Sequence, residues 1–280
     1  MKNPFEGCIL VDLVIRTWSA RKVDHKAGWE AAKAMEASGK VGRYDKALII
    51  SPLHDEVNRK AGRIRTYVYK ETLPWGSSGI RIMPTSRFMD FSVEVNGRIA
   101  DFEAAVDKLV AEMPHEINRS RARLGKMFSI MDYPSESVLR SKYAAIVSYQ
   151  PVPSAGDFRV DMPASMMQEM KERLDERLED ARKAAKEDLV SRLKGALFHV
   201  CEKLSDNEAV FRDSLIRNIG KALEIGDDVD WLGFDMSSVV PIMREISSVS
   251  PDIIRNNMAV RGSVVSKASV ALKNLEAIYG

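Results

Sequence analysis

One long amphipathic segment constrains the fold of this chain more than any other feature. After Pro163, residues 164–204 contain no proline and a single glycine, Gly195. Apolar residues recur there at steps of three or four, which predicts one helix with one buried stripe. About 40 helical residues span about 60 Å, longer than most globular helices. The stripe consists of Met167, Met170, Leu174, Leu178, Ala181, Ala185, Leu189, Leu193, Leu197, Val200 and Leu204.

A helix with a single apolar stripe needs another surface to cover it. Residues 237–247, 251–258 and 262–278 predict shorter helices that offer such a surface within the chain. We expect a second subunit to cover at least part of the stripe, so the chain is predicted to be a homo-oligomer. The candidate interaction stripe comprises Met167, Met170, Leu174, Leu178, Leu189 and Leu193.

The first half of the chain mixes strand and helix patterns. Residues 8–18 alternate in polarity and predict a half-buried strand, with further strands at 80–83, 143–149 and 158–162. Helices are expected at 22–38, at 51–71 after the Ser51-Pro52 start signal, and from about 85 to just before Pro114. Pro114 is expected to open another helix, because proline suits the first helical turn.

These patterns together predict a helix-dominated α+β fold. A small antiparallel sheet pairs residues 8–18 with residues 143–149, and helices pack on it. A long helical arm and shorter helices follow. We therefore expect two regions, an α+β domain over residues 1–162 and a helical region over residues 163–280.

The composition indicates a cytoplasmic globular protein. The two cysteines, Cys8 and Cys201, are too distant in sequence to indicate a disulfide framework. The first seven residues are polar, and no run of eighteen apolar residues occurs. Neither a signal peptide nor a membrane partner is therefore expected.

Catalytic and metal-binding motifs are not recognisable. The four histidines are scattered, and His199-x-Cys201 alone does not provide the ligand spacing of a zinc site. Gly39-Lys40 lacks the preceding glycine and the following Ser or Thr of a phosphate-binding loop. Ser191-x-x-Lys194 lies within the long helix without the motifs that accompany it in β-lactamases. We expect no catalytic, metal-binding or cofactor-binding residues, and a protein that is not an enzyme.

Basic clusters are the clearest signal for a ligand. Residues 1–150 contain 24 Lys and Arg against 18 Asp and Glu, whereas residues 151–280 contain 18 against 22. Arginine pairs with phosphate and aromatic rings stack on bases. The candidate nucleic-acid contacts are Arg16, Trp18, Arg21, Lys22, Arg119, Arg121, Arg123 and Lys126. A third group contains Arg59, Lys60, Arg63, Arg65 and Lys70, with Tyr67 and Tyr69 between them.

Each basic cluster also has a simpler explanation, a solvated helix face with its aromatic residues in the core. For residues 119–123 the backbone conformation decides between the two. In a helix Arg121 turns away from Arg119 and Arg123, whereas an extended segment would align all three. The preceding Pro114 and Glu116 favour the helix.

Several short phrases occur in an order that resembles a known family. They are Arg16-x-Trp18-Ser19-x-Arg21-Lys22-x-Asp24, Gly42-Arg43-Tyr44-x-Lys46-Ala47-Leu48, Leu73-Pro74-Trp75, Arg121-x-x-Leu124-Gly125, Asp132-Tyr133-Pro134, and Pro151-Val152-Pro153 followed by Gly156-Asp157-Phe158-Arg159-Val160. Over residues 8–165 the chain resembles an uncharacterised family of bacteriophage and prophage proteins. Such proteins tend to be encoded near MoxR-type AAA+ ATPases and von Willebrand A-type proteins. The resemblance implies an accessory role, an AAA+ ATPase partner and location in the bacterial host cytoplasm, and it supplies no catalytic residues.

Three functional hypotheses remain open from the sequence. The first is a non-enzymatic accessory protein of phage origin that acts by protein–protein interaction, through self-assembly or an AAA+ ATPase partner. The alternative is a protein that binds single-stranded nucleic acid, DNA in particular, in phage replication or recombination. The third is an enzyme with a non-standard site.

Overall fold

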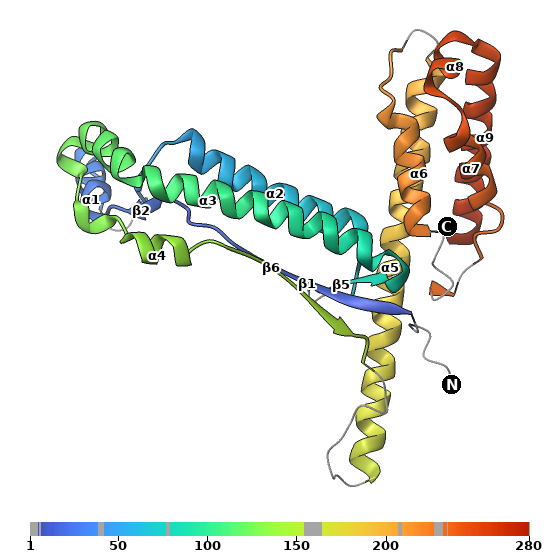
Figure 1. The fold of residues 1–280 in the computed structure, drawn as a ribbon, viewed down its shortest axis with the longest axis horizontal. Helices are drawn as coiled ribbons and strands as arrows, with labels where there is room; N and C mark the ends of the chain where they lie inside the picture. Colours follow the sequence, from blue (N-terminus) through green and yellow to red (C-terminus); the bar gives the residue numbers. More distant parts are fainter. Residues whose placement is uncertain are drawn as a thin grey trace. The chain divides into compact units, whose positions relative to one another are not determined.

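The computed structural model describes residues 5, 7–38, 42–76, 79–153, 164–206, 209–226, 232–233 and 235–279. Helices dominate it, and a small antiparallel sheet completes the predicted α+β fold (Figure 1). The chain forms two compact units. Unit 1 comprises Met1–Asp12, Glu71–Phe88 and Tyr149–Gly280, and unit 2 comprises Leu13–Lys70 and Met89–Ser148. This division differs from the predicted boundary between residues 162 and 163, which lies outside the described residues.

The main sheet has four strands in the order β4-β5-β1-β6. They are β1 (Cys8–Arg16), β4 (Leu73–Pro74), β5 (Arg81–Pro84) and β6 (Ala144–Pro151). Strand β5 runs antiparallel to β1, with Cys8 opposite Pro84 and Val11 opposite Arg81. The predicted neighbours 8–18 and 143–149 are thus confirmed as adjacent strands, and the strand predicted near residue 80 joins them. The strand predicted at 158–162 lies outside the described residues.

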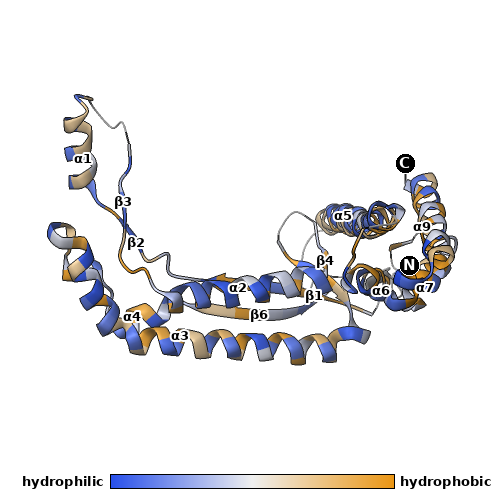
Figure 2. Cartoon of the chain, turned by 90° about the horizontal axis from the view of Figure 1, so that it is seen from above, coloured by the Kyte–Doolittle hydropathy of each residue, from blue (hydrophilic) through white to orange (hydrophobic). Residues whose placement is uncertain are grey.

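Unit 1 is built around the long predicted helix, α5 (Ala164–Ser205). It packs against α6 (Ser214–Gly226) and α9 (Met258–Tyr279), and α7 (Val240–Ser248) packs on both of these, so the helices form a bundle (Figure 2). The short helix α8 (Pro251–Asn256) contacts α9. The three shorter helices predicted from the sequence therefore correspond to α7, α8 and α9, with shifted ends.

A buried arginine caps the C-terminal end of α5. The side chain of Arg261 on α9 is 4% exposed, and it donates hydrogen bonds to the carbonyl oxygens of Lys203, Leu204, Asp206 and Ala209. The last carbonyls of a helix have no partners within the helix and carry partial negative charge. Arg261 satisfies two of them, those of Lys203 and Leu204, and so ties the end of α5 to α9.

Unit 2 contains most of two long helices, α2 (Pro52–Glu71) and α3 (Phe88–Leu124). Tyr67 of α2 stacks on Phe91 of α3 with ring centroids 5.6 Å apart. A two-stranded sheet joins β2 (Arg21–Val23) to β3 (Asp45–Ala47). The remaining elements are α1 (His25–Ala34), α4 (Glu136–Ser141) and the 3-10 turns η1 (Thr85–Arg87), η2 (Gly125–Met127) and η3 (Ile130–Asp132).

The helix predicted to end before Pro114 instead continues to Leu124, so that prediction was wrong. An internal proline removes one hydrogen bond and costs about 3 kcal/mol. Burial on both sides of it offsets this cost, because Leu109, Met113 and Glu116 are all buried. The expected start of α2 is confirmed at Pro52, whereas the helix expected over 22–38 is shorter because β2 occupies its first residues.

Candidate interaction surfaces

A buried ionic cluster in unit 2 organises the segments that carry the predicted cations. We call Lys22, Asp24, Lys46 and Asp132 the Lys46 cluster. Lys46 Nζ lies 3.1 Å from Asp24 Oδ2 and 2.8 Å from Asp132 Oδ2, and it donates a 2.7 Å hydrogen bond to the carbonyl of Met127. Lys22 Nζ donates to Asp132 Oδ1 at 2.7 Å. The cluster thereby joins β2, β3, the N-cap of α1 and the turns η2 and η3.

The surroundings of Asp24, Asp132 and Lys46 favour the charged form of each group. A hydrogen bond from the Ala27 N–H lowers the pKa of Asp24, and Lys46 lowers it further. Burial by itself would raise the pKa of Asp132, but the ammonium groups of Lys22 and Lys46 outweigh burial and lower that pKa. Burial by itself would lower the pKa of Lys46, yet Asp132 and Asp24 raise it.

Sequence reasoning did not identify the Lys46 cluster, although a signal for it was present. Three of the short phrases quoted above contain Lys22-x-Asp24, Lys46 and Asp132, and the structure brings these phrases together. Nearby, the Tyr133 hydroxyl donates to the carbonyl of Leu48 at 2.8 Å. The phrases thus share a structural role, the fixing of one end of unit 2.

Four of the eight candidate nucleic-acid contacts have partners within unit 2. Trp18 is buried, with its ring edge-on to His54 at 6.3 Å, so it offers no face for base stacking. Lys22 pairs with Asp132, and Arg119 pairs with Glu112 and Glu116. Arg123 donates to the carbonyls of Ala47 and Leu48 at 2.8 and 3.2 Å.

The other four candidate contacts remain exposed. Arg16, Arg21 and Lys126 make no ion pair with any residue that the structure describes, and Arg121 lies over the ring of Phe128 at 5.1 Å. Residues 119–123 are helical, so Arg121 points away from Arg119 and Arg123. In a helical segment, the sequence favours a solvated helix face over an aligned row of arginines. Nucleic-acid binding at these eight residues stays a prediction.

The apolar stripe of α5 is covered along only part of its length. From Ala181 to Leu204 its members are buried in the core of unit 1, and Leu189 and Leu193 are fully inaccessible. Leu178 packs against the edge of that core. Met167, Met170 and Leu174 are only half-buried and do not belong to the core, while the neighbouring Met166 is 54% exposed. The first turns of α5, here called the uncovered turns, therefore continue the stripe with side chains that the described residues leave half-exposed.

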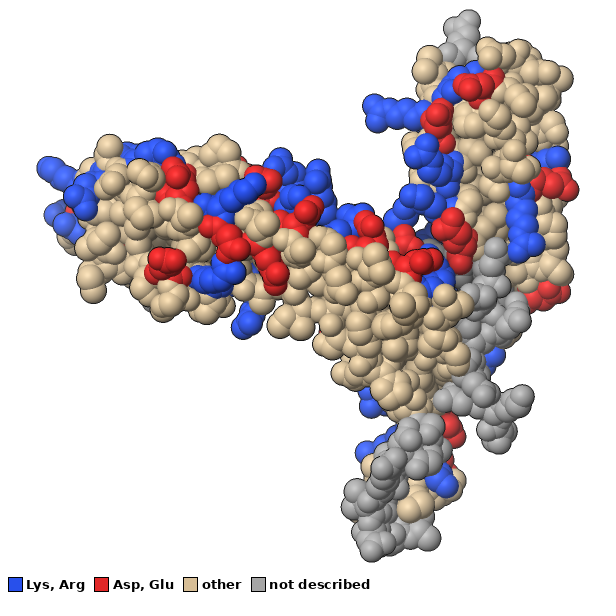
Figure 3. Space-filling view, viewed as in Figure 1, with Lys and Arg blue, Asp and Glu red and all other residues tan. Residues whose placement is uncertain are grey.

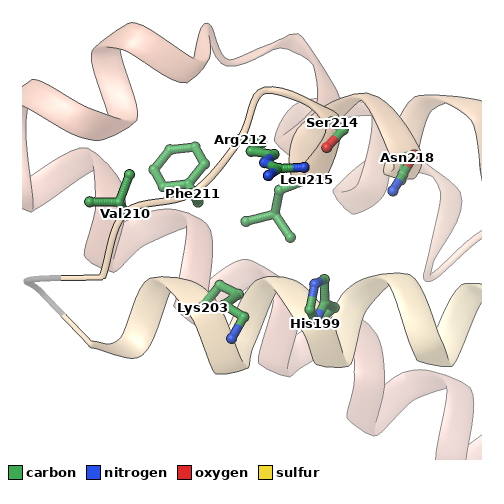
Figure 4. Close-up of a pocket in the computed structure, with 8 residues that line it drawn as sticks. All are labelled: His199, Lys203, Val210, Phe211, Arg212, Ser214, Leu215 and Asn218. Atoms are coloured by element: carbon green, nitrogen blue, oxygen red, sulfur yellow. The ribbon is translucent and has the colours of Figure 1, made fainter.

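A pocket in unit 1 lies between the last turns of α5 and the start of α6 (Figure 4). Its volume is about 220 Å³, and His199, Lys203, Arg212 and Leu215 are among the eight residues that line it. His199 is exposed and pairs with Glu202 at 3.1 Å. The described residues of the lining include Lys203 and Arg212 and no carboxylate, and none of them is a nucleophile hydrogen-bonded to a base.

A second pocket, of about 480 Å³, lies in unit 2 beside the start of α2. The Nε2 of His54 lies 2.9 Å from the carbonyl of Trp18, which acts as the acceptor and so places a proton on Nε2. The hydroxyl of Ser51 accepts from the Leu53 N–H and also bonds to Glu116. Ser51 and His54 are therefore engaged with other groups and do not form a nucleophile and base.

Within the described part of the chain, no group of three or more His, Cys, Asp or Glu side chains could hold a metal ion. No helix among those residues is both long and apolar enough to cross a membrane. Comparison with models of protein families, with curated proteins and with solved structures finds no match to the chain.

Proposed function

We propose that this chain is a non-enzymatic accessory protein that self-associates through the first turns of α5. One observation carries the proposal: the apolar stripe continues without a break from the core of unit 1 into turns where the described structure does not bury it. Met167, Met170 and Leu174 keep the helical spacing of the buried positions that follow.

The proposed partner is a second copy of the same segment. The uncovered turns are continuous with an established packing surface, the face of α5 that binds α6 and α9. A two-fold pairing of helices would place Met167 and Met170 of one copy near Leu178 and Leu174 of the other, apolar against apolar. Two-fold dimers are the commonest protein oligomers, and the same patch serves on both subunits. Phage origin and an AAA+ ATPase partner rest on the family resemblance and remain further proposals.

The expected dimer is weak. Full burial of a Leu or Met side chain contributes about 1.5–3 kcal/mol, and these side chains are already half-buried. Three or four such residues from each copy offset an association cost of about 4–15 kcal/mol by only a small margin. A dimer that forms at 200 µM needs a net gain of about 5 kcal/mol at the 1 M standard state, so the association cost must lie at the low end of that range.

Sedimentation velocity of the full chain between about 1 and 200 µM tests the proposal. The sedimentation coefficient should rise with concentration, and Met170→Asp with Leu174→Asp should keep the chain monomeric. Gln168→Asp is the matched control, because it adds a carboxylate to the exposed face of the same turns. A wild-type monomer at every concentration would refute self-association, as would equal self-association of the double variant when its helix content is unchanged.

A further inference from the structure

The exposed side of α2 carries a run of cations without carboxylates. From Val57 to Lys70 the helix contains five Lys and Arg and no Asp or Glu. Val57, Ala61, Ile64 and Val68 are buried, so the helix faces the core with its apolar side. We call Arg59, Arg63 and Lys70, all exposed and on one side of the helix, the α2 basic face, whereas Arg65 points away from Arg63. Figure 3 shows Lys and Arg, with some Asp and Glu between them, along the edge of unit 2 that α2 forms.

Most of this positive charge has no counter-charge in the structure. Lys60 lies outside the basic face and pairs with Asp101 at 2.7 Å. Arg59, Arg63 and Arg65 form no ion pair with the described residues. Arg63 lies near enough to Asp101 to contribute, after Lys60, to the lowered pKa of that carboxyl. The two guanidinium groups of the basic face, Arg59 and Arg63, therefore favour an external anion.

The net charge of unit 2 also favours the binding of an anion. Unit 2 contains 21 Lys and Arg against 15 Asp and Glu, a formal +6, whereas unit 1 contains 21 against 25, a formal −4. A surplus confined to one unit steers a polyanion toward that unit. Within it, residues 57–70 of α2 contribute five cations and no carboxylate.

Gly62 leaves one edge of the basic face bare. A Cβ at this position would meet nothing within 4 Å, so packing does not require glycine. Glycine inside a helix costs about 0.5–1 kcal/mol relative to alanine. Its neighbours on the helix surface are Arg59, Arg65 and Thr66. The bare backbone between guanidinium and hydroxyl groups gives a phosphate close access.

We propose that the α2 basic face binds the phosphate backbone of nucleic acid without reading its sequence. Arg59 and Arg63 are one turn apart, about 6 Å along the helix, and project as a row. Guanidinium groups bind phosphate oxygens through two parallel hydrogen bonds, which suits arginine for this contact. The site differs from the eight residues predicted from the sequence and is independent of self-association through α5.

Binding of the full chain to a labelled 20-nucleotide single strand and to its duplex, measured by fluorescence polarisation at several salt concentrations, tests the proposal. Replacing Arg59, Arg63 and Lys70 with Gln removes three phosphate contacts from one side of the helix. On the single strand, the slope of log affinity against log salt should flatten by about 2, which is about 0.7 for each contact. If the substitutions reduce the affinity for the duplex more than the affinity for the single strand, the duplex is the preferred ligand.

The matched control replaces Lys33, Lys108 and Lys142 with Gln, which removes the same charge from other exposed positions of unit 2. Its salt slope should equal that of the wild type. Because all six residues are exposed, both variants should keep the wild-type circular dichroism and melting temperature. Two results would overturn the proposal: a wild type that binds neither nucleic acid, or a control whose loss of affinity and change of slope equal those of the variant of the basic face.

Discussion

Replacing Lys46 with Met should show how much the Lys46 cluster contributes to the free energy of unfolding. The side chain is 8% exposed and contacts Asp24, Asp132 and the carbonyl of Met127. Methionine keeps the volume and removes the charge. Breaking a buried ion pair costs about 3–5 kcal/mol. Asp132 keeps Lys22 and Asp24 keeps its bond from Ala27, so we expect a loss at the lower end, about 3 kcal/mol.

The dependence of this loss on pH identifies its cause. Asp24 and Asp132 have lowered pKa values in the folded protein, so they contribute stability above their unfolded value of 3.8 that is lost as the pH falls through the lowered pKa. The pKa of Lys46 is raised above 10.5, so its contribution is present below pH 10.5 and is lost as the pH rises through the raised pKa. The difference between wild type and Lys46→Met should be constant from pH 5 to pH 9 and smaller outside that range.

Urea unfolding followed by circular dichroism measures both quantities. Lys22→Met is the control, because Lys22 is half-exposed and its single ion pair is worth about 1 kcal/mol or less. Equal losses for the two variants at pH 7.5 would refute the assignment of Lys46 as the centre of the cluster. A loss for Lys46→Met that is the same at pH 7.5 and in acid would show that packing, and not charge, is responsible.

Three further predictions concern the two units separately. Leu193→Ala should lower the free energy of unfolding in urea by about 2–5 kcal/mol, because the side chain is fully buried. Leu174→Ala in the uncovered turns should lower it much less. Equal losses would contradict the division of the stripe into a buried and an uncovered part. Gly62→Ala should raise the free energy of unfolding by about 0.5–1 kcal/mol, and a decrease would show that the site is tightly packed. Burial raises the pKa of Tyr143 to about 12. The free energy of unfolding should therefore fall as the pH rises above 10, because the tyrosine ionises first in the unfolded protein. Tyr143→Phe should lessen this fall, and an unchanged alkaline profile of the variant would contradict the prediction.

Local sequence determined the elements whose patterns need no distant partner. Helix α2 begins at the Ser51-Pro52 signal and α5 follows the run that lacks proline, because capping and periodicity act within a few residues. The alternating residues of β1 also marked a strand. The adjacency of β1 and β6 was predictable because a half-buried strand needs a neighbour and few other strand patterns exist.

Tertiary structure decided what depends on contacts between distant residues. Continuation of α3 through Pro114 depends on burial on both sides of the proline, which outweighs the local penalty. The Lys46 cluster joins side chains from positions 22 to 132, and no local pattern specifies such an approach. The α5 stripe has uniform spacing in the sequence, but only the placement of α6 and α9 separates its buried part from its uncovered part. The burial of a residue depends on its neighbours in the folded protein, whereas the spacing of apolar residues can be read from the sequence alone.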